Sequence, residues 1–136
     1  MNAVIDTSVA IAWYVQESFS KPAREWQDKL LAGKLHAMVP PLHYLEFANV
    51  LRTYVRRKEL DRSLAEDIYA LHLDAPLDPV EPPRHAILAA ALEFGASAYD
   101  AAFIVLAQTY ECPFITAERT TTPWVVKMGE RAISIG

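Results

Sequence analysis

The sequence contains one cysteine and four glycines, and it has no long hydrophobic run. A single cysteine cannot form an internal disulfide, and no Cys-x-x-Cys or His-x-x-x-His spacing indicates a zinc site. So few glycines exclude a glycine-rich loop that cradles phosphate, and no Gly-x-Ser-x-Gly nucleophile motif occurs. No apolar stretch reaches the roughly 18 residues of a membrane span, so we expect no transmembrane helix.

The sequence also lacks the excess of basic residues that is typical of nucleic-acid-binding surfaces. Its 13 Lys and Arg residues are outnumbered by 17 Asp and Glu residues, and the formal net charge is −4. If four acids converge on one site, the remaining acids balance the bases, and a divalent cation at that site would offset much of the local negative field. The positions of the acids therefore matter more than the sign of the total charge.

The remaining composition is that of a globular protein. The 136 residues are 52% apolar and 22% charged, which favours one domain over residues 1–136 and excludes disorder and low complexity. Asp6 interrupts the apolar N-terminal segment, and no basic segment precedes it. We therefore expect neither a signal peptide nor membrane association, and we expect a cytoplasmic protein.

Short apolar segments alternate with amphipathic segments along the chain. We expect strands over residues 3–5, 36–39, 77–80, 113–116 and 132–135. We expect helices over residues 9–15, 22–31, 42–57, 63–73, 84–94, 98–110 and 123–128. This alternation predicts a three-layer α/β/α fold with a central, mostly parallel sheet of about five short strands and helices on both faces.

Local signals predict several helix ends. Gly95 follows an Ala- and Leu-rich segment, which is typical of a helix C-terminus. Ser63 with Glu66, and Ser97 with Asp100, have the spacing of a capping box.

Four acidic residues fall near the carboxyl ends of expected strands. Asp6 directly follows the first strand, and Glu46 lies in the helix after the second. Asp100 lies in the first turn of a later helix, and Glu118 follows the strand that ends at Thr116. In a parallel sheet these positions belong to the edge where ligands bind.

Each acid alone also has a simpler structural interpretation. Asp6 and Asp100 are at positions where short polar residues cap helices, and Glu118 is a loop acid. Glu46 shares a helix face with apolar residues, so its carboxylate needs a partner, for which Asn49 is a candidate. A shared cation explains all four acids at once, and oxygen ligands favour Mg²⁺, or Mn²⁺ as a substitute.

The sequence resembles the PIN-domain family, and within it the VapC-type toxins of prokaryotic toxin–antitoxin pairs, over essentially the whole chain. The motifs that carry the resemblance are Val-Ile-Asp6-Thr7-Ser8-Val, Pro-x-x-x-x-Glu46-x-x-Asn49-Val-Leu, Ala98-Tyr99-Asp100-Ala-Ala-Phe and Ile115-Thr116-Ala-Glu118-Arg.

The resemblance implies that Asp6, Glu46 and Asp100 form an acidic metal-binding and catalytic triad. Glu118 stands where the family usually has aspartate. Because its side chain is one methylene longer, its carboxylate would approach the metal from a different position or bind it through water. Glu118 would then hold a second metal ion or position the attacking water. The residues expected to support the acids by hydrogen bonds are Thr7, Ser8, Asn49 and Thr116.

The resemblance also implies an activity and partners. The activity is magnesium-dependent endonucleolytic cleavage of structured RNA, such as a transfer RNA, by metal-activated water. The implied partners are a second copy of the chain and an antitoxin protein that blocks the site. The early aromatic residues form either plain core or a groove for an antitoxin segment; they are Trp13, Tyr14, Phe19 and Trp26.

One basic cluster is a candidate contact for RNA phosphates. It consists of Arg52, Arg56, Arg57 and Lys58, near the end of the expected helix that carries Glu46. The same cluster is also explained as a solvated helix end, where cations interact favourably with the helix dipole.

Two other functions remain open from the sequence. One is a catalytically inactive PIN-like module that binds RNA or protein. It stays open because Glu118 stands where the family usually has aspartate. The other is magnesium-dependent phosphoryl transfer by a receiver or phosphatase domain. It fits less well, because Ser8 stands where such phosphatases have a second aspartate and only Lys127 matches the receiver lysine loosely.

Overall fold

Five short strands form one sheet in the computed structural model, which describes residues 1–136. The strands are β1 (Asn2–Ile5), β2 (His36–Val39), β3 (Asp78–Pro79), β4 (Phe114–Thr116) and β5 (Ala132–Ser134). Their order in the sheet is β3-β2-β1-β4-β5, and every neighbouring pair is parallel. The carboxyl ends of all the strands therefore lie at the same edge, with β1 in the centre.

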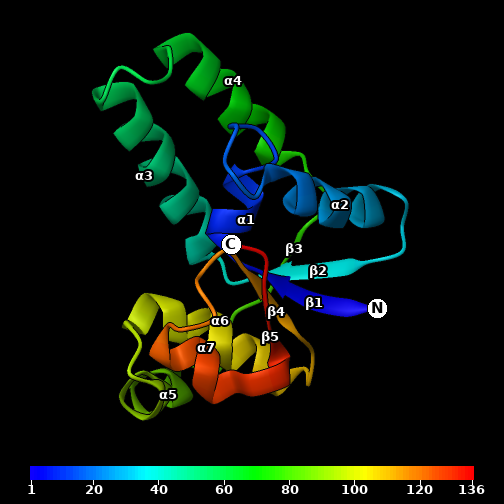
Figure 1. Ribbon diagram of the computed structural model, residues 1–136, viewed down its shortest axis with the longest axis vertical. Helices are drawn as coiled ribbons and strands as arrows, with labels where there is room; N and C mark the ends of the chain where they lie inside the picture. The colour runs from blue at the N-terminus through cyan, green and yellow to red at the C-terminus, as the bar shows by residue number, and fades with distance from the viewer.

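Helices cover both faces of this sheet, as predicted. The helices are α1 (Thr7–Ile11), α2 (Ser20–Leu31), α3 (Leu42–Arg56), α4 (Arg62–Leu73), α5 (Ile87–Phe94), α6 (Ala98–Thr109) and α7 (Pro123–Met128). Two single turns of 3₁₀ helix span Arg84–Ala86 and Gly129–Arg131. Figure 1 shows α1 to α4 on one side of the sheet and α5 to α7 on the other, which is the expected three-layer arrangement.

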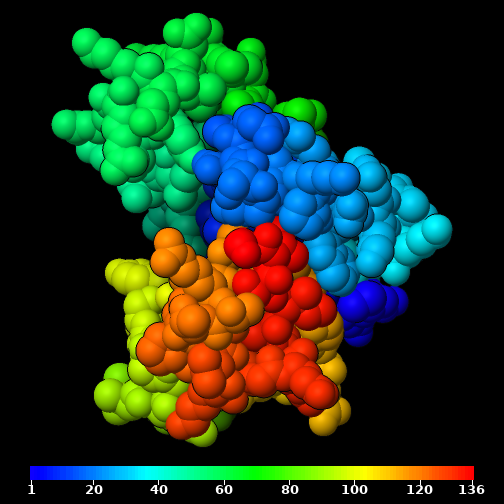
Figure 2. All heavy atoms as spheres, in the orientation of Figure 1, coloured from blue at the N-terminus to red at the C-terminus, as the bar shows by residue number.

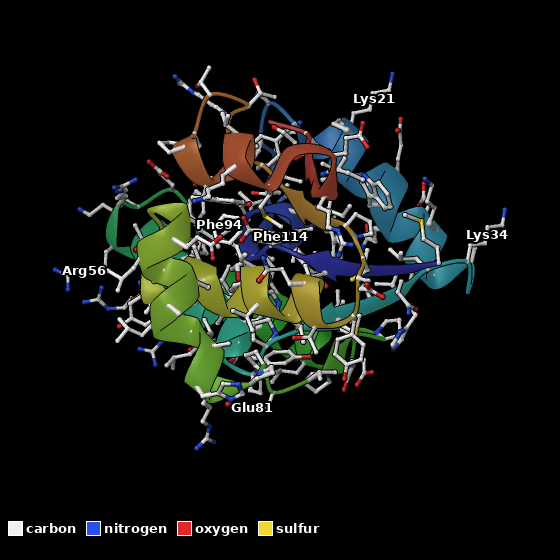
Figure 3. All side chains as sticks on the ribbon, turned by 90° about the horizontal axis from the view of Figure 1, so that it is seen from below. Lys21, Lys34, Arg56, Glu81, Phe94 and Phe114 are labelled. Carbon is white, nitrogen blue, oxygen red and sulfur yellow. The ribbon has the colours of Figure 1, made fainter.

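Each face of the sheet has its own hydrophobic core, because successive strand residues point to opposite faces. Val4 and Phe114 belong to the core under α5, α6 and α7, whereas Ile5 and Ile115 belong to the core under α1 to α4. All four side chains are fully buried. Figure 3 shows Phe114 near the centre of the molecule. Strands apolar on both faces are what a doubly covered parallel sheet requires.

The first helix is shorter than predicted. We expected a helix over residues 9–15, but α1 ends at Ile11 and the chain continues in turns. Trp13 and Tyr14 lie in these turns, and both pack against the core under α1 to α4. The Trp13 indole N–H donates to the Ala23 carbonyl at 2.9 Å, so these aromatics are mainly core.

The capping box predicted at Ser63 and Glu66 is wrong. Helix α4 begins one residue earlier, with Asp61 at the extended N-cap position, and Glu66 instead accepts a hydrogen bond from Arg62 at 2.8 Å. The end predicted at Gly95 is confirmed, because this residue adopts the left-handed conformation (φ 64°) directly after α5.

The hairpin of α3 and α4 extends away from the rest of the molecule. Figures 1 and 2 show its tip standing clear of the sheet and of α2. No single helix is long and apolar enough to cross a membrane, and the segment from Arg84 to Thr109 meets that test only as two helices joined at a bend of 109°.

Candidate active site at the carboxyl edge of the sheet

The four acids selected from the sequence lie on four different elements around one edge of the sheet. Asp6 follows β1 directly, and Glu46 lies in the second turn of α3. Asp100 is in the first turn of α6, and Glu118 is two residues beyond β4. Figure 1 shows β1 running towards the region where α1, α3 and α6 meet. The parallel topology therefore brings together side chains that are up to 112 positions apart in the chain.

These acids lie close enough to repel one another. Burial raises the pKa of Asp6 to about 7, and the negative charges of Asp100 and Glu46 contribute to this increase. Burial also raises the pKa of Glu46, with a further contribution from Asp100. The pKa of Asp100 is raised first by burial and then by the charge of Glu118. No Lys or Arg forms an ion pair with any of the four.

Asp6 is held by strand β4 and does not cap α1. The Thr116 hydroxyl donates to Asp6 Oδ2 at 2.6 Å, and the Asp6 carboxylate makes no capping hydrogen bond. Hydrogen bonds from Thr116 and Ser8 lower the pKa of Asp6, but burial outweighs them. Ser8 also accepts the Ala117 backbone N–H at 3.3 Å. Both hydroxyls thus lie beside the buried acid.

Glu46 has its hydrogen-bond partner in Thr7 and not in Asn49. The Thr7 hydroxyl donates to Glu46 Oε1 at 3.0 Å and lies 2.8 Å from His43 Nδ1. Asn49 is exposed and makes no side-chain hydrogen bond to this carboxylate, although it lines the same surface pocket. The expected partner was on the helix itself, whereas the observed one comes from α1.

Asp100 combines a structural position with a place in the acidic cluster. The Ser97 hydroxyl accepts the Asp100 backbone N–H at 3.0 Å, so Ser97 caps α6 as its spacing predicts. The Asp100 carboxylate remains close to Asp6, Glu46 and Glu118. The N-terminus of α6 favours a negative charge in its first turn, which offsets part of this repulsion.

Glu118 is more exposed than the other three acids. Its backbone N–H donates to the Thr116 hydroxyl at 3.0 Å, and Thr122 donates to its carboxylate at 3.3 Å. The Thr116 hydroxyl therefore bridges Asp6 and Glu118, which ties the end of β4 to the centre of the site.

The donor set fits a hard divalent cation in its chemistry, although no three of the side chains form a ready-made metal cage. Four carboxylates without a nitrogen or sulfur ligand are suited to Mg²⁺ or Mn²⁺. Mg²⁺ usually keeps several waters and uses one or two carboxylates, so a closed cage is not required. Mutual repulsion also keeps carboxylates apart where no cation neutralises them. The residues that would hold such an ion are Asp6, Glu46 and Asp100.

The four residues of the predicted basic cluster lie at different distances from the acidic residues. Arg52 lines a pocket together with Glu46 and Tyr99. Arg57 lies just beyond α3, where it lines a different pocket beside Glu17, and Arg56 projects outward in Figure 3. The fourth member, Lys58, is exposed in the turn that follows the helix. Only Arg52 therefore adjoins the acidic cluster through a shared pocket.

Two histidines next to the site were not selected from the sequence. His43 and His72 are fully buried, and their Nε2 atoms lie 2.8 Å apart. Neither has the spacing of a metal ligand, and they come from different helices. The available signal was their place on apolar helix faces, where His43 precedes the buried Phe47 by one turn.

The fold and the site together place this protein among α/β proteins that carry a cluster of carboxylates at the carboxyl ends of a parallel sheet, with helices on both faces. Within this class, residues 3–120 match the PIN domain family model, and the chain belongs to the PIN-domain family. PIN domains are generally nucleases and typically use a divalent metal. Membership of the family therefore supports a hydrolase activity.

Two solved structures share the fold at low sequence identity. PAE2754 from Pyrobaculum aerophilum has a TM-score of 0.75 and 18% identity, with 99% of this chain and 90% of that chain covered. FitAcB from Neisseria gonorrhoeae has a TM-score of 0.66 and 13% identity, with 98% and 97% covered. No curated protein matches the sequence.

Proposed function

We propose that this protein is a magnesium-dependent endoribonuclease. The observation that carries the proposal is the gathering of Asp6, Glu46 and Asp100 at the carboxyl ends of the strands, with no basic side chain paired to them. Buried like charges are costly unless a cation neutralises them, so the cluster is explained by the binding of a divalent ion.

In the proposed mechanism, the chain's own residues hold and orient the reacting groups. Thr116 fixes Asp6 through Oδ2, and Thr7 fixes Glu46 through Oε1, so each carboxylate keeps a second oxygen for a cation. A divalent cation bound there supplies positive charge beside the scissile phosphate and makes water a stronger nucleophile. Glu118, at the exposed side of the cluster, would position the attacking water or a second ion.

The substrate that we propose is structured RNA, for example a transfer RNA. Arg52 is the basic residue best placed to contact a phosphate next to the cleaved bond, because it shares a pocket with Glu46. Tyr99 lines the same pocket and is largely exposed, so its ring is available to an unpaired base.

We further propose that the protein is the toxin of a toxin–antitoxin pair, acting in the cytoplasm. The support is the sequence resemblance in all four motifs. A homodimer and an antitoxin that covers the acidic edge are parts of the same proposal. The apolar groove between α3 and α4, which includes Leu51, Val55 and Tyr69, is a candidate surface for either partner.

The nuclease assignment is tested by cleavage of cellular RNA with the full-length protein. We expect cleavage with Mg²⁺ that is lost in EDTA, and its loss in Asp6→Asn and Asp100→Asn. The exposed Asp28 on α2 offers a matched control, Asp28→Asn, which should cleave like the wild type. Cleavage by both site variants at the wild-type rate would reject the assignment.

A binding-only module is the second candidate, and two observations favour it. Glu118 is exposed, and no three acids form a ready-made cage. Such a module would bind RNA with the same affinity in EDTA and would release no cleaved 5′ ends. Sequencing the 5′ ends of RNA from cells that express the wild type or Asp6→Ala separates the two functions.

A further inference from the structure

A continuous series of hydrogen bonds connects Glu46 to Tyr14 through the protein interior. Thr7 Oγ1 lies 3.0 Å from Glu46 Oε1 and 2.8 Å from His43 Nδ1. His43 Nε2 lies 2.8 Å from His72 Nε2, and His72 Nδ1 lies 2.9 Å from the Tyr14 hydroxyl. We propose that Thr7, His43, His72 and Tyr14 form a one-directional hydrogen-bond relay that positions the Glu46 carboxylate for cation binding, an inference that rests on the proposed nuclease function.

Counting protons sets the direction of the relay. An ionised carboxylate can only accept, so the single hydroxyl proton of Thr7 goes to Glu46. The Thr7 oxygen then accepts a hydrogen bond from His43 Nδ1–H. A neutral imidazole carries one N–H, so His43 Nε2 accepts and His72 Nε2–H donates. His72 Nδ1 in turn accepts a hydrogen bond from the Tyr14 hydroxyl, and every donor in the series points towards the acidic cluster.

The environment keeps each member in the required protonation state at neutral pH. Burial, followed by the proximity of His72, lowers the pKa of His43 to about 3. Burial lowers the pKa of His72 to about 4 and raises the pKa of Tyr14 to about 12. Both imidazoles are therefore neutral and the phenol is protonated, which is the state that the proton count needs.

Packing prevents the rings from turning. The Phe47 ring stacks on the His72 ring with centroids 4.0 Å apart and planes 8° apart. No buried side-chain nitrogen or oxygen in the protein lacks a hydrogen-bond partner. A turned ring would leave such an atom unpaired, at a cost of about 1–3 kcal/mol.

The relay matters to the site because the alternative tautomer of His43 would oppose it. With its proton on Nε2, His43 would present a bare Nδ1 to Thr7 and compete with Glu46 for the hydroxyl proton. An N–H at His72 Nε2 excludes this tautomer, because two N–H groups cannot face each other at 2.8 Å, so the tautomers of the two histidines are coupled. His72 thus acts on Glu46 through two other residues and is a positioning residue.

The first test is nitrogen-15 NMR of the histidine rings in the full-length wild-type protein. We expect His43 protonated at Nδ1, His72 protonated at Nε2, and a scalar coupling between their Nε2 atoms across the hydrogen bond. The exposed His36 and His85 provide internal reference signals. A proton on His43 Nε2, or a charged ring at either position at pH 7, would overturn the relay without any variant.

The second test compares two substitutions of His72 by their affinity for Mn²⁺, measured by calorimetry. Glutamine places an amide N–H near the position of Nε2, whereas methionine has a similar length without a donor. We expect His72→Gln to stay within about twofold of the wild-type dissociation constant and His72→Met to bind about tenfold more weakly. The thermal unfolding midpoint of each variant monitors the fold, and a purely structural role would shift both affinities alike.

The outcomes separate the relay from the proposed function. If the wild type neither binds Mn²⁺ nor cleaves RNA, the nuclease proposal fails and the role of the relay fails with it. If the wild type does both and His72→Met binds Mn²⁺ as tightly as His72→Gln, the relay alone is rejected. Weaker binding by His72→Met, with the expected tautomers in the wild type, supports both.

Discussion

Asp6 is a residue whose burial affects the stability of the protein. Its carboxylate is buried among other acids, and its pKa is raised from 3.8 to about 7. The folded state therefore holds the proton more tightly than the unfolded state does. The stability associated with the protonated form is present at low pH and is lost as the pH rises through about 7.

Substituting asparagine for Asp6 should therefore stabilise the metal-free protein. Asparagine keeps an acceptor for the Thr116 hydroxyl but cannot ionise, so Asp6→Asn should have a higher free energy of unfolding than the wild type at pH 8. The gain should be a few kcal/mol, should shrink as the pH falls from 7 to 4, and is measured by urea unfolding in EDTA. An equal difference at pH 4 and pH 8 would contradict this assignment of the shift.

Thr116 is a second residue whose effect can be isolated. Its hydroxyl donates to Asp6 and accepts from the Glu118 backbone, and its side chain is fully buried. Thr116→Val preserves the shape but removes both hydrogen bonds, so we expect RNA cleavage to fall by about 10–100-fold. Thr116→Ser keeps the hydroxyl and should retain most of the activity. Equal activity of the two variants would show that Thr116 acts through packing alone.

At the scale of elements, helix α3 joins the hydrophobic core to the site. Its buried face carries His43 and Phe47, while Glu46 faces the acidic edge. The position of the Glu46 carboxylate therefore depends on how well α3 packs on the core. A three-residue offset from His43 places Glu46 nearly one turn further along the helix.

Removing the Phe47 ring should destabilise this helix strongly. Phe47 is fully buried and stacks on His72, so Phe47→Ala should cost about 3–5 kcal/mol of unfolding free energy. Leu45 lies on the same helix but is 76% exposed, and Leu45→Ala should change the stability by less than about 0.5 kcal/mol. Similar costs in chemical denaturation would mean that α3 packs differently from the structure described.

At the scale of the whole molecule, an acidic protein has to attract an anionic substrate. The net charge is −4, and the candidate basic residues lie mainly on the α3–α4 hairpin, away from the acids. Binding of RNA therefore depends on where the positive charges lie more than on their total. Cation binding would also reduce the negative field at the site.

Substitutions in the basic cluster should therefore differ in effect. We expect Arg52→Gln to weaken RNA binding, because Arg52 adjoins Glu46. The slope of the logarithm of the binding constant against the logarithm of the salt concentration should fall by about one. Lys58→Gln, in the turn after α3, is the control and should have a smaller effect. Titrations at several salt concentrations measure both. A larger loss in Lys58→Gln would place the RNA on the tip of the hairpin.

The order of strands and helices was predictable from local patterns. Gly95 and Ser97 act within a few residues of their positions, and the apolar strands alternate clearly with amphipathic helices. The differences concern helix ends. Helix α1 ends at Ile11, and Trp13 and Tyr14 reach the core from the turns that follow, whereas the start of α4 differs from the prediction by one residue.

The sequence alone determined which elements form, which residues carry negative charge at the ends of the strands, and which family the motifs resemble. Only the tertiary structure decided which hydroxyl holds each acid, that Arg52 adjoins Glu46, and that His43 meets His72 inside the protein. The reason is physical. Helix and strand signals depend on neighbours a few residues away, whereas a hydrogen bond between two helices depends on how both pack against the sheet.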